Sequence, residues 1–244
     1  MNSIVLGKKK VDYNLIRSKR KTLGIIVDPE QGLVVRSPET LTCKVIKATL
    51  QSKSDWILRK LEYIKKIKPE PAAKEFMSGE KLPYLGKYYR LNIIEKSTMA
   101  DDQIKVKKKE NSFKIYTSPA LRDTKYYREF IRKGLIHWYR YNANIEIKLR
   151  IGIYRYKIGV MSAKVKVKKQ KKRWGSCTGE GNIYINWRII MAPMSIVDYI
   201  VVHELAHLKH KNHSPEFWQL VEAIIPDYKE KQQWLRINGR TLTF

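Results

Sequence analysis

Acidic residues, cysteines and long apolar segments are all scarce in this chain of 244 residues. Two cysteines are too few for the disulfide framework of a small secreted domain. No stretch approaches the roughly 18 consecutive apolar residues from which a membrane-spanning helix is built. Near the N-terminus a short apolar run precedes the first lysines, whereas a secretory signal has the opposite order. These absences predict a cytoplasmic protein that does not insert into membranes.

The shortage of acidic residues gives the chain a large positive charge. Lysine and arginine number 50 against 23 aspartate and glutamate residues, so the formal net charge is +27. The excess is unevenly distributed, because residues 196–244 contain six basic and six acidic residues. All of it therefore lies in residues 1–195, and a basic surface of that size attracts nucleic acid, anionic membranes or acidic proteins.

Hydrophobic periodicity and turn signals predict an α+β fold that begins with a β-rich region. In residues 1–70, short apolar runs on both sides of the turn signal Asp28–Gly32 predict a hairpin. Apolar residues then recur at helical intervals, which predicts one amphipathic helix over 41–68. The Pro69-Glu70-Pro71 segment ends this helix and is a candidate linker.

Two further regions are predicted after the linker. Residues 71–120 contain a hairpin over 82–91 and two more short strands, and therefore form a second β-rich region. Residues 121–244 begin with a helix over about 124–145, and the chemistry is concentrated in this region. No internal repeat is evident in the sequence.

The middle of the third region predicts two strands and a new helix. Residues 164–168 alternate between lysine and valine, and residues 182–190 form a second apolar run, so the pair is predicted to be a hairpin. Turn-forming residues lie between them, over 174–181. We expect the second strand to lie beside a cleft and to pair with an extended peptide. Ser195 and Asp198 then match a capping box for the next helix.

That helix contains the motif His203-Glu204-Leu205-Ala206-His207. Histidines four residues apart lie one turn apart on the same face, so both imidazoles can reach one ion. Glu204 is offset by about 100° from His203, so it can accept a proton from a metal-bound water instead of ligating. Imidazole ligands favour zinc, and the motif therefore predicts a zinc-dependent hydrolase, in the first instance a peptidase, with Glu204 as general base.

One catalytic zinc per chain requires a third protein ligand and leaves the fourth position to water. His213 is preferred, because the helix is expected to end at about 209–212 and the reversal returns His213 toward the metal. This spacing matches the metzincin pattern, but His210 stands where metzincins have glycine and no methionine follows the motif. Glu222 or Glu216 from the following helix is the alternative third ligand.

Four blocks of the sequence carry a resemblance to a known family. They are Arg20-Lys21-Thr22-Leu23-Gly24-Ile25, Tyr84-Leu85-Gly86, Arg173-Trp174-Gly175-Ser176-Cys177, and the stretch from His203 through Asn212-His213-Ser214 to Phe217-Trp218. Together they resemble the YgjP-like metallopeptidases, metal-dependent hydrolases related to SprT-like zincins. The resemblance implies a zincin-like catalytic domain after the β-rich regions, a peptide or protein substrate, ligands at His203, His207 and His213, and a base at Glu204.

A cluster of cations directly precedes the Trp174-Gly175-Ser176 block. If the predicted hairpin lies by the catalytic helix, these cations border the cleft and could contact substrate or nucleic acid. The related SprT-like zincins cleave DNA-bound proteins, which suggests the hypothesis that this chain acts near DNA or another polyanion. A solvated strand face is the simpler alternative. The cluster consists of Lys164, Lys166, Lys168, Lys169, Lys171, Lys172 and Arg173.

A non-catalytic function is the main alternative to a hydrolase. The chain would then be a nucleic-acid-binding module with a structural zinc site. Such a site has four protein ligands and usually recruits cysteine, so Cys177 or His210 would supply the fourth. Glu204 at the position of the base argues against this alternative.

Overall fold

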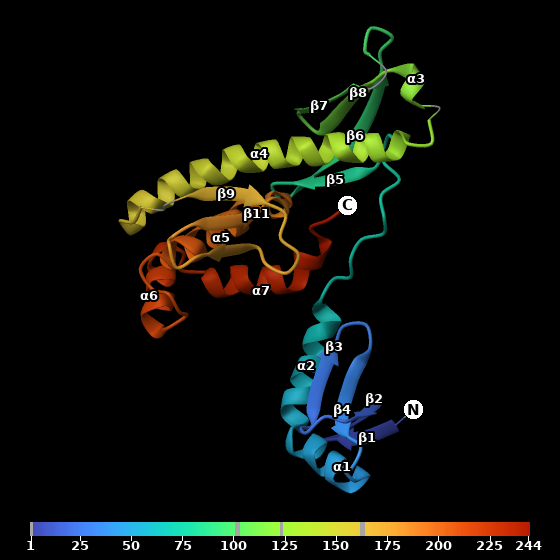
Figure 1. Ribbon diagram of the computed structural model, residues 1–244, viewed down its shortest axis with the longest axis vertical. Coiled ribbons are helices and arrows are strands. Elements are labelled where there is room, and N and C mark those ends of the chain that lie inside the picture. Colours follow the sequence, from blue (N-terminus) through green and yellow to red (C-terminus); the bar gives the residue numbers. More distant parts are fainter. Residues whose placement is uncertain (1, 101–102, 123, 162–163) are drawn as a thin grey trace. The chain divides into compact units, whose positions relative to one another are not determined.

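The computed structural model describes residues 2–100, 103–122, 124–161 and 164–244. The chain divides into two compact units, Met1–Pro69 and Glu70–Phe244, and each has its own hydrophobic core (Figure 1). Three sheets and seven α-helices lie in the described residues, and the predicted α+β fold class is confirmed. Among the same residues, no helix combines the length and the apolarity needed to cross a bilayer.

The first unit is a four-stranded sheet covered by two helices. Its strands are β1 (Asn2–Leu6), β2 (Lys9–Ser18), β3 (Gly24–Asp28) and β4 (Gly32–Pro38), in the order β1-β2-β4-β3. The predicted hairpin is confirmed, because β3 and β4 pair antiparallel around the Asp28–Gly32 turn. The single helix predicted over 41–68 is instead two helices that meet at Lys53, namely α1 (Cys43–Ser52) and α2 (Ser54–Lys66).

The second unit begins with a sheet of the same design. Its strands are β5 (Lys81–Tyr84), β6 (Lys87–Glu95), β7 (Ile104–Lys109) and β8 (Ser112–Thr117), in the order β5-β6-β8-β7. In both sheets the inner strands run parallel and each outer strand forms a hairpin with its neighbour. The two sheets thus share a topology that no sequence repeat indicated.

A long helix, α4 (Tyr127–Ile158), follows the short α3 (Pro119–Arg122) and joins this sheet to the rest of the unit (Figure 1). It is longer than the predicted 124–145 and ends at Gly159, whose φ of 69° is left-handed. Its buried residues recur every three or four positions, as one face of a helix requires. The hydroxyl of Tyr139 donates to the carbonyl of Pro83 on β5 at 2.6 Å, which fixes α4 on the sheet.

The third sheet corrects the predicted hairpin. β9 (Val165–Lys168) pairs parallel with β11 (Ile183–Asn186), so these two strands cannot form a hairpin. The expected turn region contains a further strand, β10 (Gly175–Cys177), which pairs antiparallel with β11. The order is β10-β11-β9, so β11 has partners on both sides and cannot accept a peptide as expected. Among the described strands, β10 is the edge on the side of the candidate site.

The remaining elements follow the third sheet in the chain. They are the 3-10 turn η1 (Trp187–Met191), the helices α5 (Met194–Ala206), α6 (Pro215–Ile224) and α7 (Tyr228–Asn238), and the final turn η2 (Gly239–Thr241). Helix α5 is central, because it contacts α4, α6, α7, β10 and β11. Ser214 and Pro215 begin α6 as N-cap and first helical residue, as the Ser-Pro pair favours.

Candidate active site

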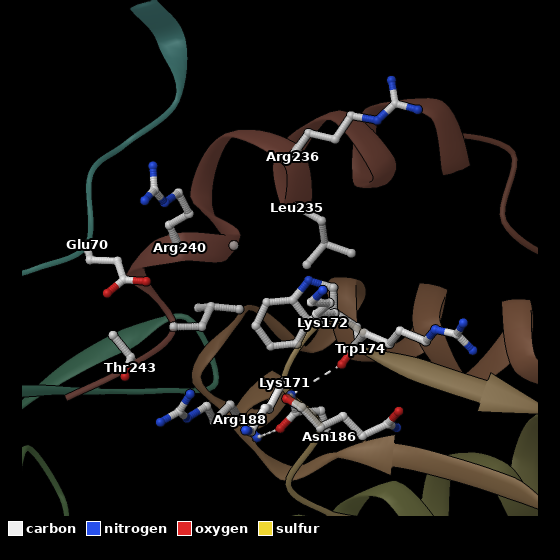
Figure 2. A pocket seen from close by; sticks show the side chains of 14 residues that line it. Glu70, Lys171, Lys172, Trp174, Asn186, Arg188, Leu235, Arg236, Arg240 and Thr243 are labelled. Atoms are coloured by element: carbon white, nitrogen blue, oxygen red, sulfur yellow. Dashed lines mark hydrogen bonds between the residues drawn. The ribbon is translucent and has the colours of Figure 1, made fainter. Parts of the chain in front are cut away.

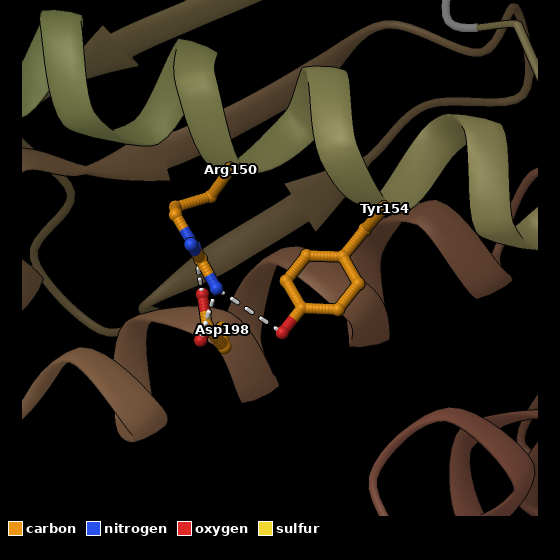
Figure 3. Close-up of polar contacts among 3 residues, drawn as sticks. All are labelled: Arg150, Tyr154 and Asp198. Atoms are coloured by element: carbon orange, nitrogen blue, oxygen red, sulfur yellow. Dashed lines mark hydrogen bonds and ion pairs between the residues drawn. The ribbon is translucent and has the colours of Figure 1, made fainter.

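Helix α5 is held in place by an ion pair with α4 (Figure 3). The guanidinium of Arg150 makes two hydrogen bonds to the Asp198 carboxylate and donates to the Tyr154 hydroxyl at 3.3 Å. The bonds to Asp198 raise the pKa of Arg150. The predicted capping box is wrong, because Pro193 precedes the helix and Ser195 already lies inside it. Asp198 therefore anchors α5 to α4 and does not cap it.

Three histidines converge at the C-terminal end of α5. His203 lies in its last turn, His207 is the C-cap residue, and His213 lies in the connection to α6. The Nε2 atoms of His203 and His213 are 3.1 Å apart, and one nitrogen from each of the three rings lies within 4.8 Å of the others. The connection thus reverses toward α5, as the sequence predicted, although α5 itself ends at Ala206.

Neighbouring groups fix the orientation of two of these rings. His207 donates from Nδ1 to the carbonyl oxygen of His210 at 3.1 Å, which leaves its Nε2 lone pair available to a metal. The exposed ring of His213 stacks on Trp218 with centroids 5.4 Å apart. Trp218 stacks in turn on Tyr228 at 5.1 Å, so α6 and α7 both support the third histidine.

Glu204 points from α5 toward the edge strand β10. Its side chain is only 4% exposed, and among the described residues its Oε2 atom has no hydrogen-bond partner. A Cβ atom built on Gly175 would lie 2.4 Å from Oε1 and 2.7 Å from Cδ of this carboxylate. Only a glycine therefore allows β10 to approach so closely. This role was not predicted, because a glycine among turn-forming residues indicates a turn and not a close contact with a helix.

Burial changes the ionisation of both kinds of group in the site. It lowers the pKa of His203 to about 3, with the neighbouring His207 and His213 adding to the effect. It raises the pKa of Glu204 to about 8, against the opposing effect of the Arg173 guanidinium. Burial also lowers the pKa of His207, so the imidazoles of His203 and His207 favour the neutral form, which is the form that binds metal ions.

The spacing of one pair of these nitrogens matches a tetrahedral zinc ion. With Zn–N bonds of about 2.0–2.1 Å, neighbouring ligand nitrogens are separated by about 3.3 Å, close to the spacing of His203 and His213. No cysteine, aspartate or glutamate among the described residues joins this cluster, so the rivals Glu216, Glu222 and Cys177 lie outside it. Three protein ligands leave one position open.

A cleft of about 650 Å³ lies between the histidines and β10. It is lined by Glu204 and the three histidines on one side and by residues 175–179 on the other. Arg173 and Lys211 also line it. Cys177 is half-buried in this wall, and burial raises the pKa of its thiol.

The predicted cation cluster is divided by the fold. Arg173, Lys171 and Lys172 precede β10 and line pockets at or beside the cleft. Lys164, Lys166, Lys168 and Lys169 lie on or next to β9, on the far side of β11 from β10. Lys168 places its Nζ atom 3.6 Å from the ring centroid of Tyr184. The structure therefore brings only the second half of the cluster to the cleft.

Of the comparisons with known proteins, the family match agrees with a metal-dependent site. A family model described as "YgjP-like, metallopeptidase domain" matches residues 21–238. No curated protein matches the sequence. Among solved structures, the chain is similar to the crystal structure of the metallopeptidase zymogen of Pyrococcus abyssi abylysin, with 24% identity and a TM-score of 0.35. That similarity covers 38% of this chain and 93% of the abylysin chain.

Proposed function

Because the chain belongs to the YgjP-like metallopeptidase family, we propose that it hydrolyses peptide bonds with one zinc ion held by His203, His207 and His213. Glu204 is the general base in this proposal. The observation that carries it is the convergence of three ring nitrogens within 4.8 Å of one another, beside a buried carboxylate and an open cleft. This combination has the three ligands and one free position of a catalytic zinc site.

The edge strand β10 provides the means to hold a substrate. An extended peptide can add to a free strand edge through main-chain hydrogen bonds, and β10 borders the cleft opposite the histidines. A peptide on this edge passes Gly175, which lies directly against Glu204. The scissile bond would therefore lie between the edge strand and the carboxylate.

The chemistry follows from the groups that surround that bond. A bound zinc would supply Lewis acidity to the scissile carbonyl and to the attacking water. Glu204 acts in its ionised form, which the charge of a bound zinc would favour against the effect of burial. In that form Glu204 accepts a proton from the water and delivers it to the leaving amine nitrogen. Its burial keeps bulk water away from the carboxylate, and Arg173 offers a positive charge for the developing oxyanion.

A polyanionic partner such as DNA is a separate part of the proposal. Its support is the net charge of +27 and the exposure of Lys166, Lys168 and Lys169 beside β9. Binding of this kind releases counterions, so the affinity for a DNA duplex should fall steeply as salt is raised. Binding that is undetectable at low salt would rule this partner out.

A binding module with a structural zinc would need a fourth protein ligand. The three-histidine cluster gives this alternative little support, because neither Cys177 nor the imidazole of His210 belongs to it. The buried Glu204 also has no purpose in a structural site.

The direct experiment compares wild type with Glu204→Gln and measures zinc content and cleavage of casein or a peptide, with and without DNA. The variant is expected to retain one zinc and to lose cleavage. Glu216→Gln is the matched control and should behave as wild type, because Glu216 is exposed and lies outside the histidine cluster. A zinc-loaded wild type that cleaves nothing, or a Glu204→Gln variant that cleaves normally, would refute the proposal.

A further inference from the structure

A strongly basic pocket lies beside the cleft (Figure 2). Its volume is about 460 Å³, and Trp174, Leu235 and Leu242 form the apolar part of its wall. Glu70 is the one acidic residue among those that line it. We call this cavity the basic pocket. Six cationic residues line it: Lys171, Lys172, Arg173, Arg188, Arg236 and Arg240.

Arg188 is the most enclosed of these cations. It lies in η1, and its Nε atom is buried without a hydrogen-bond partner among the described residues. Burial lowers the pKa of this guanidinium, Arg132 adds to the effect, and Glu70 opposes it. A buried donor without an acceptor is costly. Arg188 lines the basic pocket, so an anion there would offset the cost of burying its positive charge.

The basic pocket is held open by a buried amide. Asn186 is 4% exposed, and its Nδ2 atom donates to the carbonyl oxygens of Gln170 at 2.9 Å and Arg173 at 3.2 Å. Its Oδ1 atom accepts from the backbone N–H of Arg188 at 3.2 Å. One side chain thus fixes both the segment that carries the lysines and the turn that carries Arg188, so the cations are arranged before a ligand arrives.

A third cavity lies between the basic pocket and the catalytic cleft. Its volume is about 350 Å³, and it shares Lys172, Arg173 and Trp174 with the basic pocket. It shares His203 and Glu204 with the cleft. The three cavities are therefore neighbours, and Arg173 lines all of them.

We propose that the basic pocket is a specificity subsite that binds a carboxylate side chain of the polypeptide substrate. This inference rests on the proposed peptidase function. Strands advance by about 3.3 Å per residue, so a peptide paired with β10 reaches Arg173 and Lys172 about two or three residues from the bond beside Gly175. The subsite selects substrates with aspartate or glutamate at that distance from the cleaved bond.

The arrangement favours an acidic peptide over a nucleic-acid strand. A phosphate backbone would need a continuous row of cations beyond the basic pocket. The lysines on or next to β9 do not provide it, because they line neither the basic pocket nor the cleft; they are Lys164, Lys166 and Lys168. The cations instead surround a concave site with an apolar wall, and Arg173 lines both this site and the catalytic cleft. Such a site suits one charged side chain of a chain that is already bound along β10.

The test starts from a neutral peptide that wild type cleaves. It is compared with a series of peptides in which a single glutamine is replaced by glutamate, at a different position in each peptide, on both sides of the scissile bond. We expect kcat/KM to rise about tenfold to a hundredfold at one position, two or three residues from the bond, as one charge-assisted contact allows. Arg188→Gln and, separately, Arg236→Gln should abolish this preference and leave cleavage of the neutral peptide unchanged. Lys148→Gln, an exposed site on α4, removes the same charge and should keep the preference.

Several outcomes separate this inference from the function on which it rests. If neutral peptides are cleaved but no glutamate position is preferred, or if the preference survives both arginine substitutions, the subsite is refuted and the peptidase stands. Binding can also be measured with the Glu204→Gln variant, even if no cleavage is detected. The subsite is supported if this variant binds the glutamate peptide more tightly than the neutral peptide, and if adding Arg188→Gln removes the difference. If these substitutions instead weaken only the binding of a single-stranded oligonucleotide, the pocket is a nucleic-acid site and the proposal is wrong.

Discussion

The two ends of the groove beside β10 are built from different kinds of side chain. At the metal end, the rings of His203 and His207 are partly buried, Glu204 is buried, and ring stacking and a backbone carbonyl fix the geometry. At the basic end, Asn186 fixes the backbone before β10 and at Arg188, but the side chains of Lys171 and Lys172 are exposed. Bond cleavage requires fixed distances between the reacting atoms, whereas binding of a charged side chain tolerates some movement of the cations that attract it. Substitutions at the metal end should therefore lower kcat, and those at the basic end should change substrate preference.

The largest effect is expected from removal of a metal ligand. His203→Ala or His207→Ala should lose bound zinc and lower cleavage about a thousandfold or more, since a metal contributes several kcal/mol to the transition state. Zinc content and peptide cleavage measure both effects. The matched control is His137→Ala on α4, which should retain zinc. If His203→Ala bound zinc as wild type does, the metal end would be wrongly assigned.

A smaller loss is expected when the spacing between β10 and α5 changes. Gly175→Ala places a methyl group within 2.7 Å of the Glu204 carboxyl carbon, so the carboxylate must move. Zinc should stay bound while kcat falls about tenfold to a hundredfold, because the base is displaced. Gly152→Ala is the control, since a Cβ there meets nothing within 4 Å. Unchanged kcat in Gly175→Ala would show that the position of Glu204 is not critical.

Loss of the stacked support for His213 should weaken zinc binding only moderately. In Trp218→Leu we expect about tenfold lower zinc affinity, as for other groups that orient a metal ligand, with activity restored by added zinc. Competition with a chelator measures the affinity. Trp56→Leu, in the first unit, controls for loss of a tryptophan and should bind zinc normally. Activity that zinc cannot restore would assign Trp218 a role beyond supporting the ligand.

The smallest effect on activity is expected at the ion pair between α4 and α5. Arg150→Gln or Asp198→Asn should lower the free energy of unfolding by about 1–3 kcal/mol, because the remaining partner is partly buried and unpaired. Cleavage by the folded variant at 25 °C should be nearly unchanged. The double variant should cost less than the sum of the single ones in a denaturant titration. Additive losses would show that the pair does not stabilise the helix.

Local patterns in the sequence predicted much of the fold. The hairpins of β3 with β4 and of β5 with β6 followed from turn residues between apolar runs, and the α+β class followed from the change of period. The predictions that were wrong concerned residues whose structure is determined by tertiary contacts. Asp198 matched a cap but pairs with Arg150, which lies 48 residues earlier in the chain. Strand β10 was hidden because a three-residue strand rich in small residues has the composition of a turn.

In the candidate site, too, some features follow from local sequence patterns and others only from tertiary contacts. The spacing of His203, Glu204 and His207 is local, so helical geometry alone brought these residues to one place. The reversal that returns His213 was readable from the helix-ending residues before it. Gly175 and the basic pocket depend on segments far apart in the sequence, because Arg188, Arg236 and the residues before β10 meet only in the folded unit. No local pattern could indicate them.

The most direct test of the central claim is X-ray absorption at the zinc edge of the purified protein. The account predicts three imidazole nitrogens at about 2.0–2.1 Å and one oxygen from water, with one zinc per chain. The spectrum of Glu204→Gln should show the same ligands, since this residue does not bind the metal. A sulfur at about 2.3 Å, or a fourth imidazole in place of water, would contradict an open catalytic site and indicate a structural zinc.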